Sequence, residues 1–214
     1  MTRLLFTGTG RCGTGYVAAA LNACGVRCGH EQVYTLQTAL RDTPPVWGHW
    51  QAESSWLAAP RLWNSEVKAL HLVRHPLAYV RSALEIGLFH DARRSAYTDA
   101  IYRHMPAIER WKDPANRALA MWAWWNGCIG AYTTDYYRIE DFGLATLAEV
   151  LHSIGHGRSD LPAIWAKVAN DPGARNLKTA EKPQRLESVA TSLFQPKLLD
   201  EARKLSAHYG YAGW

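Results

Sequence analysis

The chain has 214 residues, a formal net charge of +5 and a hydrophobic fraction of 48%. This length suits one α/β domain with a full core, so we expect residues 1–214 to form a single domain. No stretch approaches ~20 uninterrupted apolar residues, and the N-terminal apolar run is too short for a signal peptide, so we expect no membrane span. Lysine and arginine are scattered along the chain, which favours an anionic small ligand over nucleic acid.

The four cysteines give no sign of a disulfide framework. Without a signal peptide, reduced thiols and a cytoplasmic location are the default expectation. Cys24, Cys28 and His30 have the residue types of a zinc cluster, but no second Cys or His pair at a suitable spacing completes a tetrahedral site. We therefore expect no metal.

Strands alternate with helices along the chain. Apolar runs predict strands at about residues 3–7, 46–50, 67–73 and 133–139, with a short extended segment at 26–33. Helical patterns occur at about residues 13–23, 53–63, 76–86, 117–132, 140–155 and 196–210. This alternation predicts a three-layer α/β fold, in which a mostly parallel central sheet has helices on both faces.

The first predicted strand leads into a glycine-rich turn, FTGTGRCGTGY at residues 6–16, and then into an alanine-rich helix. This arrangement is typical of phosphate binding, because glycines let the backbone approach an anion and a helix N-terminus attracts it. The candidate binding residues of the turn are Gly10, Arg11, Cys12, Gly13, Thr14, Gly15 and Tyr16. The lysine that completes an ATP-type loop is missing. A tight strand-to-helix turn without a ligand is the other interpretation.

A second group of polar residues follows the strand predicted at residues 67–73. In LHLVRHPLAYVRSAL, Arg74 stands at the strand end and Ser82 lies eight residues later, two turns into the next helix. In such a fold ligands bind at the carboxyl ends of the strands, so Arg74 and Ser82 are candidates to grip one anion together. The alternative is an arginine that caps the sheet edge and a serine that faces solvent.

Together the two motifs resemble those of the sulfotransferases that use 3′-phosphoadenosine-5′-phosphosulfate (PAPS). In that family the first loop holds the 5′-phosphosulfate, and the arginine and serine of the second motif hold the 3′-phosphate. The stretch HEQ at residues 30–32 looks like the position of a catalytic glutamate in some members, including the tyrosylprotein branch. Other segments resemble small bacterial members. The likeness covers most of the chain and implies a P-loop-like nucleotide-binding fold.

The chain departs from the family pattern in places. Many members have lysine where Arg11 stands, and Ile139 replaces a common tyrosine that helps to hold the adenine. Tyr16 sits where an aromatic residue often stacks on the adenine, so we expect it to carry more of that contact. The family's Gly- and Lys-rich C-terminal loop is not recognisable. By position alone, three residues of a polar loop are candidates to replace it, namely Arg175, Asn176 and Lys178.

The resemblance implies in-line transfer of a sulfuryl group from PAPS to an acceptor hydroxyl or amine, which leaves 3′-phosphoadenosine 5′-phosphate (PAP). Arg11 and the loop amides would stabilise the charge on the leaving phosphate. A base must remove the proton of the acceptor. Glu31 and His49 are the candidates, and we favour Glu31; the alternatives are a surface carboxylate for Glu31 and a core histidine for His49. Glu53 is expected to cap a helix.

We expect the acceptor to be a small molecule, a sugar or a peptide. Its pocket is expected in residues 87–116, whose aromatic residues are Phe89, Tyr97, Tyr102 and Trp111. Two other classes of function stay open: an ATP-dependent small-molecule kinase and a non-catalytic nucleotide- or RNA-binding module. The missing Gly-Lys-Ser/Thr argues against the kinase, and the helical core spacing of most aromatics argues against the binding module. The sequence does not indicate an oligomeric state.

Overall fold

A computed structural model describes residues 3–64, 67–90, 94–171 and 188–214 of the protein. One sheet contains β1 (Leu4–Gly8), β2 (Cys28–His30), β3 (Ala52–Ser54), β4 (Lys68–Val73) and β5 (Tyr136–Arg138). The strand order is β2-β3-β1-β4-β5, and all neighbouring pairs are parallel. The α/β class and the parallel sheet are as the sequence predicts.

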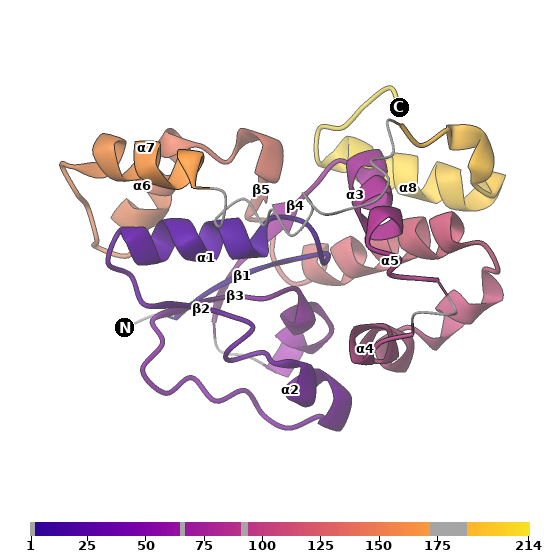
Figure 1. Cartoon of the computed structure of the whole chain (residues 1–214), viewed down its shortest axis with the longest axis horizontal. Coiled ribbons are helices and arrows are strands. Elements are labelled where there is room, and N and C mark those ends of the chain that lie inside the picture. Colours follow the sequence, from indigo (N-terminus) through magenta and orange to yellow (C-terminus); the bar gives the residue numbers. More distant parts are fainter. Residues whose placement is uncertain (1–2, 65–66, 91–93, 172–187) are drawn as a thin grey trace.

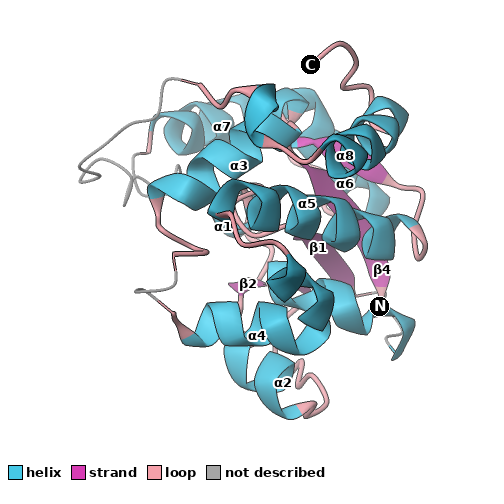
Figure 2. Cartoon of the chain, turned by 90° about the vertical axis from the view of Figure 1, so that its right-hand side faces the viewer, coloured by secondary structure: helices cyan, strands magenta, loops and turns pink. Residues whose placement is uncertain are grey.

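Helices lie on both faces of this sheet (Figures 1 and 2). The α-helices are α1 (Thr14–Ala23), α2 (Leu36–Arg41), α3 (Pro76–Glu85), α4 (Ala96–His104), α5 (Pro114–Gly130), α6 (Leu144–Ser153), α7 (Leu161–Asn170) and α8 (Pro196–His208). The 3₁₀ helices are η1 (Trp56–Asn64), η3 (Pro106–Arg110), η4 (Ile139–Asp141) and η6 (Thr191–Leu193). Leu4 and Phe6 pack with residues of α1, α6 and α7, whereas Leu5 packs with residues of α3, α5 and α8. The alternation along β1 therefore separates the two helical layers.

The central strands β1 and β4 form because their residues are apolar on both faces. All five residues of β1 are buried, as are the last five of β4. Such near-continuous apolar runs are typical of parallel strands that helices cover on both sides. A Cβ atom on Gly8 would lie 2.1 Å from the carbonyl oxygen of Leu72, so β1 ends in the one residue type that lets β4 approach this closely.

Four segments differ from the prediction. Residues 46–50 are a loop rather than a strand, because Gly48 has a φ of 49° and Trp50 donates back to the Trp47 carbonyl in a turn. Residues 53–63 are not one helix: β3 ends at Ser54, and a 3₁₀ helix that contains Pro60 follows. The sequence pattern also predicts no helix at residues 36–41 or 161–170, where α2 and α7 lie.

The topology creates a switch point between two neighbouring strands, β1 and β4. The chain leaves β1 through α1 toward β2 at one edge, and it leaves β4 through α3 to α5 toward β5 at the other edge. Adjacent strands whose connections run in opposite directions form a topological switch point, and ligands of open α/β sheets bind there, outside the carboxyl ends of the strands. The loop after β1 and the residue after β4, Arg74, lie at this place.

Two further properties concern the described part of the chain. None of its helices is both long enough and apolar enough to cross a membrane. The same residues also include no cluster of three or more His, Cys, Asp or Glu side chains with the geometry to hold a metal ion.

Candidate functional site

The glycine-rich turn after β1 forms a strand-to-helix loop with two residues in the left-handed region. Arg11 has a φ of 74° and Gly13 a φ of 90°. Gly13 is the N-cap of α1, and no side chain caps this helix end. The φ of Gly13 favours glycine, and a Cβ atom there would lie 2.6 Å from the side chain of Ile139, which would have to shift. The loop thus presents a helix N-terminus, which favours anions.

Arg11, Arg74 and Ser82 come together at the switch point. The Nη1 atom of Arg74 donates to the backbone carbonyl oxygen of Arg11 over 2.8 Å. The Nε atom of Arg11 donates to the Oγ atom of Ser82 in α3 over 3.1 Å. Trp122 of α5 fixes the end of β4, because its Nε1 atom donates to the carbonyl oxygen of Arg74 over 2.9 Å. The two motifs therefore form one cluster, as their sequence positions predict.

The two guanidinium groups of this cluster are partly buried and lie close to each other. Burial, and after it the positive charge of Arg74, lowers the pKa of Arg11. Burial likewise lowers the pKa of Arg74, which the charge of Glu140 partly offsets. Among the described residues no carboxylate lies within 4.0 Å of either group. Two partly buried like charges without an ion-pair partner have an electrostatic reason to bind an anion.

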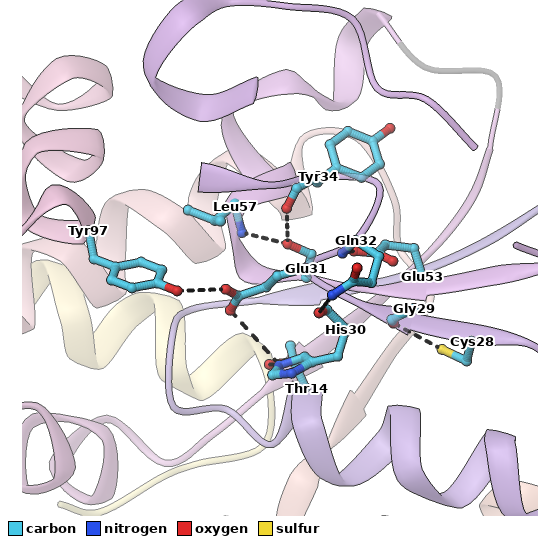
Figure 3. Close-up of polar contacts among 11 residues, drawn as sticks. Thr14, Cys28, Gly29, His30, Glu31, Gln32, Tyr34, Glu53, Leu57 and Tyr97 are labelled. Carbon is cyan, nitrogen blue, oxygen red and sulfur yellow. Dashed lines mark hydrogen bonds and ion pairs between the residues drawn. The ribbon is translucent and has the colours of Figure 1, made fainter. Parts of the chain in front are cut away.

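Glu31 follows β2 at the same edge of the sheet (Figure 3). Its Oε2 atom accepts a hydrogen bond from the Oη atom of Tyr97 in α4 over 3.2 Å. Its Oε1 atom lies 3.9 Å from the Nε2 atom of His30, and that nitrogen lies 3.3 Å from the Oγ1 atom of Thr14 at the start of α1. A chain of polar contacts therefore connects the glycine-rich loop after β1, the candidate base Glu31 and the helix α4.

Glu53 does not cap a helix, contrary to the expectation. It lies in the strand β3, and its side chain is buried. Ser55, the residue after β3, caps η1 instead, because its Oγ atom accepts from the Leu57 amide over 3.3 Å. The Oε1 atom of Glu53 accepts from the backbone amide of Gln32 over 2.9 Å. Burial raises the pKa of Glu53 to about 7, although hydrogen bonds from backbone amides act against this shift.

The structure does not bring His49 to this cluster. The expectation placed it at the end of a strand, but it precedes β3, and its exposed ring packs on Trp50 with 4.4 Å between ring centroids. Because β2 and β3 are parallel, a residue before β3 lies at the amino edge of the sheet, whereas Glu31 lies at the carboxyl edge. His49 is therefore neither near Glu31 nor a core histidine.

Other predicted residues occupy varied environments. Cys12 is buried, and burial raises the pKa of its thiol to about 12, so it offers the loop a neutral side chain. Tyr16 packs edge-on against Trp165 of α7, with 5.8 Å between ring centroids. Gly15 faces the ring of His30. The three candidates of the C-terminal loop, Arg175, Asn176 and Lys178, lie outside the described residues.

The aromatic residues of segment 87–116 divide between two places. A cavity of about 230 Å³ is lined by Leu88, Phe89, His90, Arg94, Thr98 and Tyr102. Tyr97, in the same helix as Tyr102, faces Glu31 instead. Trp111 packs against the core cluster on that side of the sheet. The helix α4 therefore carries residues of both the cavity and the Glu31 contact.

Sequence reasoning missed the parts of the site that tertiary contacts create. Tyr97 is 66 residues from Glu31, and no local pattern indicates that they meet. His30 belongs to the quoted HEQ stretch, but only the structure reveals its contact with Thr14. A single acidic residue in a three-residue strand gave no signal for the burial of Glu53.

Comparison with known proteins finds no matching family model, no matching curated protein and no matching solved structure.

Proposed function

We propose that the protein is a sulfotransferase that moves a sulfuryl group from PAPS to a hydroxyl or amine of an acceptor. The observation that carries the proposal is the cluster of Arg11, Arg74 and Ser82. It lies at the topological switch point, and its two partly buried guanidinium groups have no carboxylate partner among the described residues. A ligand with two separate anionic groups suits this cluster, because the loop and the end of β4 supply neighbouring positive sites.

The residues fit the phosphate groups of PAPS in a simple division of roles. The N-terminus of α1 and Arg11 would hold the 5′-phosphosulfate, while Arg74 and Ser82 would hold the 3′-phosphate. Arg11 donates to Ser82 through Nε, so the two phosphate sites would share this guanidinium. A P-loop-like mode of nucleotide binding is part of the same proposal, with arginine in place of the missing lysine.

PAPS supplies the sulfuryl group, and the chain supplies charge stabilisation and a base. Arg11 and the helix N-terminus would stabilise the negative charge that develops on the leaving phosphate. Glu31 would take the proton that the acceptor oxygen or nitrogen loses as it forms the new bond to sulfur. Tyr97 donates to the Oε2 atom of Glu31, so Oε1, which lies 3.9 Å from the Nε2 atom of His30, would take the proton. The acceptor, a small molecule, a sugar or a peptide, would approach along α4.

The test follows labelled sulfur from PAPS into water and into a panel of phenols, sugars and amines, with EDTA present. We expect transfer by the wild-type protein and a loss of ~100-fold or more in Glu31→Gln, with the affinity for PAP unchanged. Glu109→Gln, which changes an exposed carboxylate of η3, is the matched control and should transfer normally. If the wild-type protein transfers no label, or Glu31→Gln transfers it normally, the proposed mechanism is wrong.

A further inference from the structure

A second carboxylate, that of Glu53 in the strand next to β2, holds the turn that carries Glu31. Glu53 lies in β3, next to β2, and its side chain is 0% exposed. Its carboxylate accepts from the amide of Gln32 over 2.9 Å, and the amides of Val33 and Tyr34, which are close enough to lower its pKa, favour its charged form. These three residues directly follow Glu31 in the chain. One buried side chain therefore anchors the segment in which the candidate base sits (Figure 3).

The buried carboxylate of Glu53 requires a glycine in the neighbouring strand and leaves one of its oxygens without a hydrogen bond among the described residues. A Cβ atom on Gly29 of β2 would lie 2.1 Å from the Oε2 atom of Glu53, so the neighbouring strand carries glycine where the carboxylate lies. That Oε2 atom is buried and has no hydrogen-bond partner among the described residues. A buried carboxylate with an unpaired oxygen is unfavourable, and an apolar side chain of similar size is often more stable in such a place. Stability alone therefore does not account for Glu53.

The backbone conformation of Glu31 indicates why the hydrogen bond between Glu53 and the Gln32 amide matters. Glu31 has a φ of 58°, in the left-handed region that residues other than glycine rarely adopt. Such a conformation persists only where the surroundings fix it, and it is often found at functional sites. The amide that Glu53 holds belongs to the very next residue, Gln32. This hydrogen bond therefore helps to fix the peptide after Glu31, and with it the position of the Glu31 carboxylate beside Tyr97.

We propose that Glu53 is a positioning residue for Glu31, which it orients through the backbone amides of residues 32–34. The inference rests on the proposed function in that it takes Glu31 as the base. Glu53 itself touches no substrate, because it is buried beneath the turn.

The charge of Glu53 adds a pH dependence to this role. Two titratable groups interact with it: the charge of Glu31 raises the pKa of Glu53, and Glu53 in turn adds to the raised pKa of the buried Cys28 thiol. Burial has the largest effect and brings the pKa of Glu53 to about 7. An ionised carboxylate makes stronger hydrogen bonds to amides than a protonated one. We therefore expect the turn to tighten as the pH rises through neutrality.

The first experiment needs no substrate. The amide resonances of Gln32, Val33 and Tyr34 are followed by NMR between about pH 5 and about pH 9. We expect all three to shift with a common midpoint near 7, to lose this shift in Glu53→Gln, and to keep it in Ser54→Ala, a change of a buried hydroxyl in the same strand. If the wild-type amides do not titrate together, or still do so in Glu53→Gln, the proposal is wrong.

The second experiment measures sulfuryl transfer. Glu53→Gln should lower kcat by about 100-fold, as a small misplacement of a catalytic group does, while the Kd for PAP stays within about two-fold of wild type. Normal transfer by this variant would overturn the proposal.

If the wild-type protein transfers no sulfuryl group, the proposed function fails, whereas the amide titration still decides the role of Glu53. If Glu53→Gln does not fold, Glu31→Gln decides: loss of the Glu31 charge should move the amide midpoint to lower pH, and an unmoved midpoint contradicts the coupling.

Discussion

Arg74 holds Arg11 in a left-handed backbone conformation. The Nη1 atom of Arg74 donates to the carbonyl oxygen of Arg11 over 2.8 Å, and Arg11 has a φ of 74°. The side chain of Arg11 then reaches Ser82 of α3. This arrangement joins the loop after β1, the end of β4 and the helix that follows it. An anion bound at the switch point would therefore contact groups from all three elements at once.

The first prediction concerns the 3′-phosphate. Arg74→Ala should weaken the binding of PAP by ~10- to 100-fold, because a charge-assisted hydrogen bond is lost, and should weaken adenosine 5′-phosphosulfate much less. Arg110→Ala, a change of an exposed arginine in η3, should leave both affinities unchanged. Calorimetric titration of the three proteins with both nucleotides gives the comparison. Equal losses for the two nucleotides would show that Arg74 does not contact the 3′-phosphate.

The second prediction concerns the contact between Tyr97 and Glu31. Tyr97→Phe removes the hydroxyl that donates to Glu31 but keeps the ring beside Trp56. We expect sulfuryl transfer to fall by ~10-fold, because the Glu31 carboxylate loses the partner that orients it. In the Glu31→Gln background the same change should have little further effect, since the two residues act through one contact. Full additivity of the two losses would mean that Tyr97 acts independently of Glu31.

The third prediction concerns the close approach of β1 and β4. Gly8→Ala should destabilise the protein by about 3 kcal/mol, because its Cβ would lie 2.1 Å from the Leu72 carbonyl oxygen and 2.5 Å from the Cys12 Sγ atom. Gly127→Ala is the control: it lies inside α5 with no atom within 4 Å of the added Cβ, and should stabilise by about 0.5–1 kcal/mol. Urea unfolding of both variants measures the difference. Equal stabilities would contradict the described packing.

The fourth prediction concerns a buried histidine in β4. The Nε2 atom of His71 lies 2.8 Å from the Oδ1 atom of Asn126, and its Nδ1 atom is buried without a partner in the described part of the chain. Burial lowers the pKa of His71 from 6.5 to about 4. The folded protein therefore binds fewer protons than the unfolded chain in this range, and His71 should reduce stability as the pH falls from about 6.5 to about 4, by up to about 3 kcal/mol.

Glu53 acts in the opposite direction over an overlapping range, because its pKa is raised from 4.5 to about 7 and folding favours its protonated form. The contribution of His71 is therefore measured as the difference in the free energy of unfolding between the wild-type protein and His71→Gln. Urea unfolding at several pH values should show a steeper loss of stability in acid for the wild-type protein. Parallel pH curves would mean that His71 is not buried in its neutral form.

The sequence predicts the central strands and the positions of Arg74 and Ser82 because their signals are local, whereas the contacts of Arg11 with both residues span 63 and 71 positions and depend on the sheet. β1 and β4 are apolar runs, and Arg74 and Ser82 are two turns apart in one strand-helix unit. The edge of the sheet was harder to predict. The aromatic stretch at residues 46–50 has the composition of a strand, but the left-handed Gly48 turns it into a loop. The site beyond the arginines depends on pairs such as Glu31 and Tyr97, which only the packing of α4 brings together.

Calorimetric titration with PAP, ADP and adenosine 5′-phosphosulfate in the absence of magnesium tests the central claim most directly. The arrangement of Arg11, Arg74 and Ser82 predicts that PAP binds tightly and that its affinity depends on the 3′-phosphate. Binding without preference among the three nucleotides, or a preference for ADP that requires magnesium, would contradict a PAPS site and would favour an ATP-dependent kinase instead.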